Sequence, residues 1–199
     1  LLTEGAFFFA DMSVHKPSLI NRGADAATWD LGTIAKKLRP AYLAALLNIF
    51  RGIEVVKNLK VVATVILNLE QASTLEKCEQ FWWVSAGLVH SLHDKGLELS
   101  IAVKIMLGRI DRQIKRVIDA GEETFQAQPP EDIIKNLLYY ISRSTSHAVR
   151  VQDLKKAFKL DQAMLEAGAV SDARDQLIGF NANLMANVSG QIKEEMLRI

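Results

Sequence analysis

The chain has 199 residues, of which 49% are hydrophobic, so it can bury the core of one ordinary domain and is not expected to be disordered. Its 24 Lys and Arg oppose 23 Asp and Glu, and the net charge of +1 excludes a global field for nucleic acid or an anionic membrane. The single cysteine, Cys78, excludes an internal disulfide framework and a paired-cysteine zinc or redox motif, and it fits a reducing, cytoplasmic compartment.

The first 36 residues are the least regular part of the chain. Turn-rich segments at 15–17 (HKP) and 21–23 (NRG) predict a connecting arm over 1–36. The apolar segment at 6–10 (AFFFA) lacks a basic leader, and no apolar run approaches the ~18 residues of a membrane span, so no membrane insertion is expected. Because the chain opens at Leu1 without a methionine, we expect it to be a piece of a longer protein.

A short first helix is predicted between Arg39 and Gly52. Pro40 suits the first turn of a helix, and Gly52 suits its end. The apolar face of this helix is expected to comprise Tyr42, Leu43, Leu46, Leu47 and Phe50.

Three longer helices are predicted next, over 53–72, 75–94 and 99–120. The Ser73–Thr74 pair offers N-caps for the second of them, and Gly121 is expected to end the third. Four helices joined by loops of a few residues favour antiparallel neighbours, and therefore a bundle.

The C-terminal part is expected to cover this bundle. The segment at 129–132 (PPED) starts a fifth helix, and apolar spacing from Val151 marks a short sixth one. A long helix is predicted over 170–199, within a C-terminal part (161–199) that packs on or leads out of the bundle. The predicted fold is therefore all-α: an antiparallel bundle in 37–160 with additional covering helices. The expected core residues are Phe50, Leu59, Val62, Ile66, Phe81, Leu88, Leu92, Leu107, Ile110, Ile114, Leu137 and Leu138.

Motifs of the familiar enzyme classes are absent from the sequence. It contains no GxGxxG or GxxxxGK[ST] loop, no GxSxG elbow, no HExxH helix and no EF-hand loop. His90 and His93 lie three residues apart on one predicted helix but lack a third ligand, so two partly exposed histidines are favoured over a metal site. We predict a protein that is not an enzyme and uses no metal or cofactor.

Trp83 is a first candidate for protein contact. In the segment FWWVSAGLVHSL (81–92) it lies opposite the main apolar face. The favoured interpretation is that Trp83 packs beneath the fifth or last helix, and the alternative is that it forms part of a partner surface.

A basic stripe on the fourth predicted helix is a second candidate. It comprises Arg109, Arg112 and Arg116. Beside it, i,i+4 ion pairs are expected for Lys115 with Asp111 and with Asp119. Such stripes are usually solvated, but three arginines without an acid on their own row are also suited to docking an acidic partner.

Several segments resemble one known family. They are RPAYLAALLNIFRG (39–52), FWWVSAGLVHSL (81–92), LGRIDRQIKRVI (107–118), PPEDIIKNLLYYISRS (129–144) and VRVQDLKKAFKLD (149–161). They resemble the N-terminal region of the type IV pilus chemosensory kinases ChpA and PilL and their stand-alone FimL relatives. The resemblance implies a histidine-phosphotransfer-like (Hpt-like) helical domain of a bacterial cytoplasmic pathway that controls twitching motility and cyclic AMP signalling. The partners it implies are proteins of that pathway, a response regulator or a polar scaffold protein.

The residues around His90 decide between two roles for such a domain. An active phosphotransfer helix carries HxxKG, in which the lysine one turn after the exposed histidine neutralises the phosphoryl group. Here Lys95 follows His90 at plus five, about 140° off that row, and Gly96 is expected to be an ordinary helix stop. We therefore predict a non-catalytic scaffold that acts through protein contacts. The alternative is an active relay between a CheA-like kinase and a response regulator, with His90 as phosphoacceptor.

Overall fold

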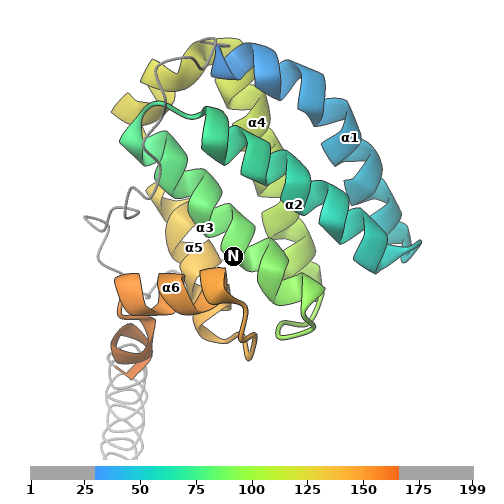
Figure 1. The fold of residues 1–199 in the computed structure, drawn as a ribbon, viewed down its shortest axis with the longest axis vertical. Coiled ribbons are helices and arrows are strands. Elements are labelled where there is room, and N and C mark those ends of the chain that lie inside the picture. Colours follow the sequence, from blue (N-terminus) through green and yellow to red (C-terminus); the bar gives the residue numbers. More distant parts are fainter. Residues whose placement is uncertain (1–29, 166–199) are drawn as a thin grey trace, which may run out of the picture.

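A computed structural model describes residues 30–165, and within them it contains helices and no strand, which confirms the predicted all-α class. In chain order the helices are α1 (Leu31–Arg51), α2 (Val55–Ala72), α3 (Glu76–His93), α4 (Ile101–Ala127), α5 (Glu131–Ser142) and α6 (Val149–Ala157) (Figure 1). None of these helices is both long and apolar enough to cross a membrane. The predicted helix over 170–199 and most of the predicted arm lie outside the described residues.

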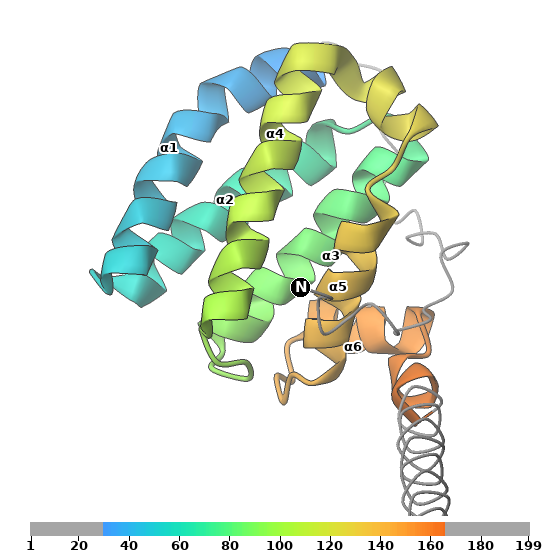
Figure 2. The same cartoon turned by 180° about the vertical axis from the view of Figure 1, so that it is seen from behind.

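The helices α1 to α4 form the predicted bundle. α2 packs between α1 and α3, and α4 packs mainly on α1 and also contacts α3. α5 lies against α3 and α4, and α6 lies against α3 and α5, so both cover the bundle on the side away from α1 (Figures 1 and 2). As a result α3 has neighbours nearly all round, whereas α1 lies at the edge with two neighbours.

The predicted core is confirmed except at one position. Eleven of the expected residues, from Leu59 to Leu138, are buried, but Phe50 is 41% exposed. The reason lies in α1, whose two neighbours cover only the side that carries Tyr42 and Ile49. The apolar face predicted for this helix was too wide, because Leu43 and Leu47 lie outside the contact like Phe50.

α1 begins earlier than predicted. The side chain of Asp30 accepts a hydrogen bond from the backbone N–H of Thr33 at 3.1 Å, so the helix starts at Leu31, inside the expected arm. Pro40 therefore lies within the helix rather than in its first turn, at an exposed position. The helix ends at Gly52 as expected, in the left-handed conformation that glycine adopts without strain.

The end of α4 also differs from the prediction. Gly121, with φ 78° and ψ 173°, kinks the helix, which then continues to Ala127. After the kink the carboxylate of Glu122 accepts hydrogen bonds from the backbone N–H groups of Thr74 and Leu75, each at 2.7 Å. The predicted caps at Ser73 and Thr74 were therefore wrong: Glu122 caps the start of α3 from a distant part of the chain.

Candidate functional site

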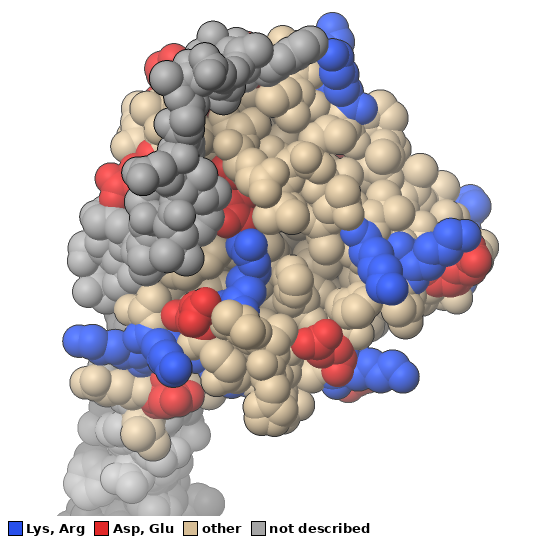
Figure 3. Space-filling model, in the orientation of Figure 1, with Lys and Arg blue, Asp and Glu red and all other residues tan. Residues whose placement is uncertain are grey.

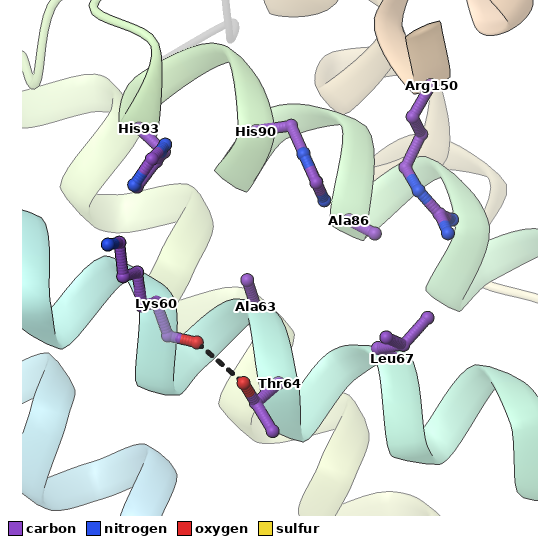
Figure 4. Close-up of a pocket in the computed structure, with 8 residues that line it drawn as sticks. All are labelled: Lys60, Ala63, Thr64, Leu67, Ala86, His90, His93 and Arg150. Atoms are coloured by element: carbon purple, nitrogen blue, oxygen red, sulfur yellow. Dashed lines mark hydrogen bonds between the residues drawn. The ribbon is translucent and has the colours of Figure 1, made fainter. Parts of the chain in front are cut away.

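His90 lies in a pocket between α2, α3 and α6. The pocket has a volume of about 450 Å³, and the polar side chains of His90, His93, Lys60 and Arg150 reach the space between the helices (Figure 4). Its other lining residues are Ala63, Thr64, Leu67 and Ala86. His90 is half-buried, so its ring is less accessible than the exposed phosphoacceptor that the relay alternative needs.

The surroundings of His90 favour its neutral form. Burial lowers the pKa of the imidazole, and the nearby Arg150 guanidinium lowers it further, while Asp94 opposes the shift. Arg150 is itself held by a 2.6 Å ion pair with Glu70, whose side chain is only 1% exposed. The pocket is thus fixed on its α6 side by a largely buried ion pair.

Lys95, which the sequence places off the row of His90, does not line this pocket. Lys95 lies beyond the end of α3 with φ 58°, and is exposed. Lys60 of α2 and Arg150 of α6 line the pocket instead. Sequence reasoning missed both because they belong to other helices, and no spacing within α3 points to them.

Gly96 has a packing role that differs from the predicted helix stop. Lys95, not Gly96, takes the left-handed conformation at the end of α3. A Cβ atom on Gly96 would lie 2.3 Å from the backbone nitrogen of Ser146. The glycine therefore permits a close approach of two loops, which is also fixed by the hydrogen bond from Thr145 N to Gly96 O at 2.8 Å.

His93 is tied to its neighbour in sequence. Its Nδ1 lies 3.2 Å from Oδ1 of Asp94, and Asp94 also accepts a hydrogen bond from Ser146 Oγ at 2.9 Å. Among residues 30–165, no three His, Cys, Asp or Glu side chains gather as a metal site.

Cys78 is unsuited to act as a nucleophile. Burial raises the pKa of its thiol to about 12, so the reactive thiolate is not formed at neutral pH. Its sulfur accepts a hydrogen bond from Nε1 of Trp82 at 3.3 Å, which is a packing contact within the core.

Trp83 is placed inside the molecule. Only 4% of it is exposed, and its ring lies 5.8 Å from that of Phe158, just after α6. The burial of Trp83 contradicts the alternative in which it forms an exposed partner surface. Among the described residues its ring packs against Phe158, and the last predicted helix lies outside them.

The predicted basic stripe divides into two parts. Arg116 donates a hydrogen bond to the carbonyl of Gln128 at 2.8 Å and lies over the ring of Phe125, so it stabilises the turn after α4. Arg109 and Arg112 have no hydrogen bond or ion pair with the described residues, and Arg112 is exposed. These two arginines remain available for an external contact.

The expected ion pairs beside the stripe are half correct. Lys115 pairs with Asp119 as predicted. Asp111 instead accepts two hydrogen bonds from Arg39 of α1, at 2.8 and 2.9 Å, in the bidentate geometry of a strong pair. Asp111 is therefore neutralised across the α1–α4 contact.

Charged side chains are unevenly distributed over the face formed by α1, α2 and α3. Figure 3 shows a broad area without Lys, Arg, Asp or Glu over its middle, with charged groups mainly toward its edges. Such a surface is better suited to contact with protein than to binding of a polyanion.

Comparison with known proteins identifies a family whose model matches this chain. Residues 28–171 match the family model described as the FimL scaffold protein second domain. The chain is also similar to the scaffold protein FimL of Pseudomonas aeruginosa, with 22% identity over 195 residues that cover 98% of this chain and 34% of the relative. It thus spans about a third of that relative's length. No solved structure matches the chain.

Proposed function

Because the chain belongs to the family of FimL second domains, we propose that it is a non-catalytic scaffold module that acts by binding other proteins. The family match covers most of the chain and agrees with the FimL side of the resemblance read from the sequence. The proposed setting is a bacterial cytoplasmic chemosensory pathway that controls type IV pili, twitching motility and cyclic AMP signalling, with partners drawn from that pathway.

The environment of His90 is the observation that supports a scaffold rather than a phosphate relay. A phosphoacceptor histidine must be exposed to an aspartyl phosphate and to the receiver domain that bears it. His90 is half-buried in the pocket between α2, α3 and α6, and the Arg150–Glu70 ion pair lies beside it. The helices α2 and α6 line the pocket on either side of this ring, which restricts the approach of a receiver domain.

A phosphotransfer assay tests this proposal. The full chain would be incubated with a phosphorylated response regulator of the same pathway, and acid-labile phosphate on the chain would be measured. We expect none above the level of the His90→Gln variant, since glutamine keeps roughly the size and hydrogen bonding of the imidazole but is not a nucleophile. In the cell, pilus-dependent motility is expected to be unchanged in His90→Gln.

The relay alternative has a distinct signature in the same experiments. Phosphate that appears on the parent chain but not on His90→Gln, together with lost motility in a variant that remains folded, would establish His90 as a phosphoacceptor. The matched variant His93→Gln, on the same helix and pocket, controls for structural effects of removing an imidazole.

A further inference from the structure

Exposed apolar side chains gather along one edge of the bundle. Of the ten large hydrophobic residues that are exposed in the described part of the chain, five lie on α1 and the first turns of α4. We call this group the α1–α4 surface: Leu43, Leu47, Phe50, Ile101 and Ile105, exposed by 40%, 48%, 41%, 79% and 53%. Single exposed hydrophobic residues are ordinary, but a contiguous group marks an interaction site.

The two helices present these residues as neighbouring rows. Arg39 pairs with Asp111 and the hydroxyl of Tyr42 donates to the carbonyl of Leu107 at 2.9 Å, so α1 and α4 run antiparallel side by side (Figure 2). A depression of about 370 Å³ lies between them, lined by Phe50, Ile101, Lys104, Ile105, Gly108, Arg109 and Arg112. Apart from its chain neighbours and the backbone of its own helix, no atom lies within 4 Å of the position of a Cβ at Gly108, so this part of α4 is open to an approaching chain.

The charges around this depression all have one sign. Lys104, Arg109 and Arg112 line it, and none of them has a hydrogen bond or ion pair with the described residues. The nearest acid on the same helix, Asp111, is already held by Arg39. An apolar surface bordered by three unpaired cations is complementary to a ligand that is apolar at its centre and acidic at its border.

We propose that the α1–α4 surface binds an amphipathic helix of a partner protein, with an apolar stripe flanked by Glu or Asp. This inference rests on the proposed scaffold function and specifies its contact. The apolar side chains of the partner helix would pack over Leu47, Phe50 and Ile105, in the manner of a helix in a groove. The carboxylates of the partner helix would pair with Arg109 and Arg112, whose guanidinium groups are well suited to bidentate contact with a carboxylate.

A second copy of this chain fits the surface less well. In a twofold dimer the same surface faces itself, which would bring the cations of both copies into one interface. The charge pattern therefore favours a different, acidic partner.

The test uses synthetic helical peptides and the full 199-residue chain. The first peptide has leucines at i, i+3, i+4 and i+7 flanked by glutamates. The second has lysines in place of the glutamates, and the third has alanines in place of the leucines. Calorimetric titration is expected to show binding of the first peptide. The dissociation constants of the other two should be at least tenfold higher, which corresponds to a loss of about 1.4 kcal/mol in binding free energy.

Variants of the chain locate the contact. Leu47→Asp and Arg112→Glu are each expected to weaken binding of the acidic peptide about tenfold. In Leu47→Asp the new carboxylate would have to be desolvated in the contact, and in Arg112→Glu the new carboxylate would repel the glutamates of the peptide. The matched controls are Val149→Asp, an exposed apolar residue on α6, and Lys156→Glu, the same charge change on α6. Both controls should bind like the parent chain. Circular dichroism would check that every variant keeps its helices, and Arg112→Glu leaves the apolar rows intact.

Several outcomes would overturn the inference. These are no binding of the acidic peptide, equal binding of the lysine peptide, or equal weakening in test and control variants. Sedimentation that shows a dimer abolished by Leu47→Asp would assign the surface to a second copy instead, and binding of anionic vesicles lost in Arg112→Glu would assign it to a membrane surface. Phosphate on His90 with peptide binding retained would refute the scaffold function but leave this surface standing, so the two failures are distinguishable.

Discussion

Two helices of similar apolar character are used in opposite ways in this molecule. In α3, 13 of 18 residues are buried, including polar ones such as Gln80 and Ser85. In α1, only six of 21 are buried, and large apolar side chains such as Leu47 face outward. The difference arises from position, because α3 is packed by α2, α4, α5 and α6 whereas α1 has only α2 and α4. Apolar composition alone therefore does not distinguish a core helix from an interaction surface.

Close backbone packing reinforces the contrast. A Cβ atom on Gly87, in the middle of α3, would lie 2.2 Å from Cδ1 of Leu154 in α6. The glycine lets α6 approach α3, and the same approach brings Arg150 to the pocket beside His90. On α1 the outward residues meet no such constraint, so they are free to be used for binding.

The largest effect should separate a core leucine from a surface leucine. Leu88→Ala in α3 is expected to lower the free energy of unfolding by about 2–5 kcal/mol, because a fully buried side chain leaves a cavity. Leu47→Ala in α1 should change it by no more than about 0.5 kcal/mol. Urea denaturation of both variants measures the difference, and equal losses would show that α1 is covered by something in the isolated chain.

A smaller effect is expected at the start of α3. Glu122→Ala removes the carboxylate that accepts hydrogen bonds from Thr74 and Leu75, and should cost about 1–3 kcal/mol because two partly buried backbone donors lose their partner. Glu123→Ala, at the next and exposed position, is the matched control and should change stability little. A loss as large in Glu123→Ala as in Glu122→Ala would mean that the cap contributes nothing of its own.

The smallest effect concerns pH and His90. Its pKa is lowered in the folded chain, so below about pH 6.5 the unfolded chain binds the proton more readily. The contribution of the neutral His90 ring to the free energy of unfolding is complete above that pH and is lost as the pH falls. The free energy of unfolding should therefore decrease from pH 7 toward pH 5. His90→Gln does not titrate, and its thermal midpoint should fall less over this interval. Parallel curves for parent and variant would show that His90 is as easily protonated as in the unfolded chain.

The apolar spacing of the sequence was sufficient to predict most of the fold. Periods of three and four residues in α2 to α5 predicted their positions and nearly all of the core, because these helices have neighbours on the side that the pattern marks. The kink at Gly121 and the cap by Glu122 had no comparable signal, since they depend on contacts between residues about 48 positions apart.

The candidate sites show the same division. From the sequence alone, the misplaced Lys95 argued against phosphotransfer, and the spacing of the arginines indicated a basic row on one helix, since both follow from angles within a single helix. Only the tertiary structure placed Trp83 against Phe158, engaged Arg116 with Gln128, and left Leu47 uncovered. Local periodicity decides which side chains share a face, but whether that face is buried depends on which other helices pack against it.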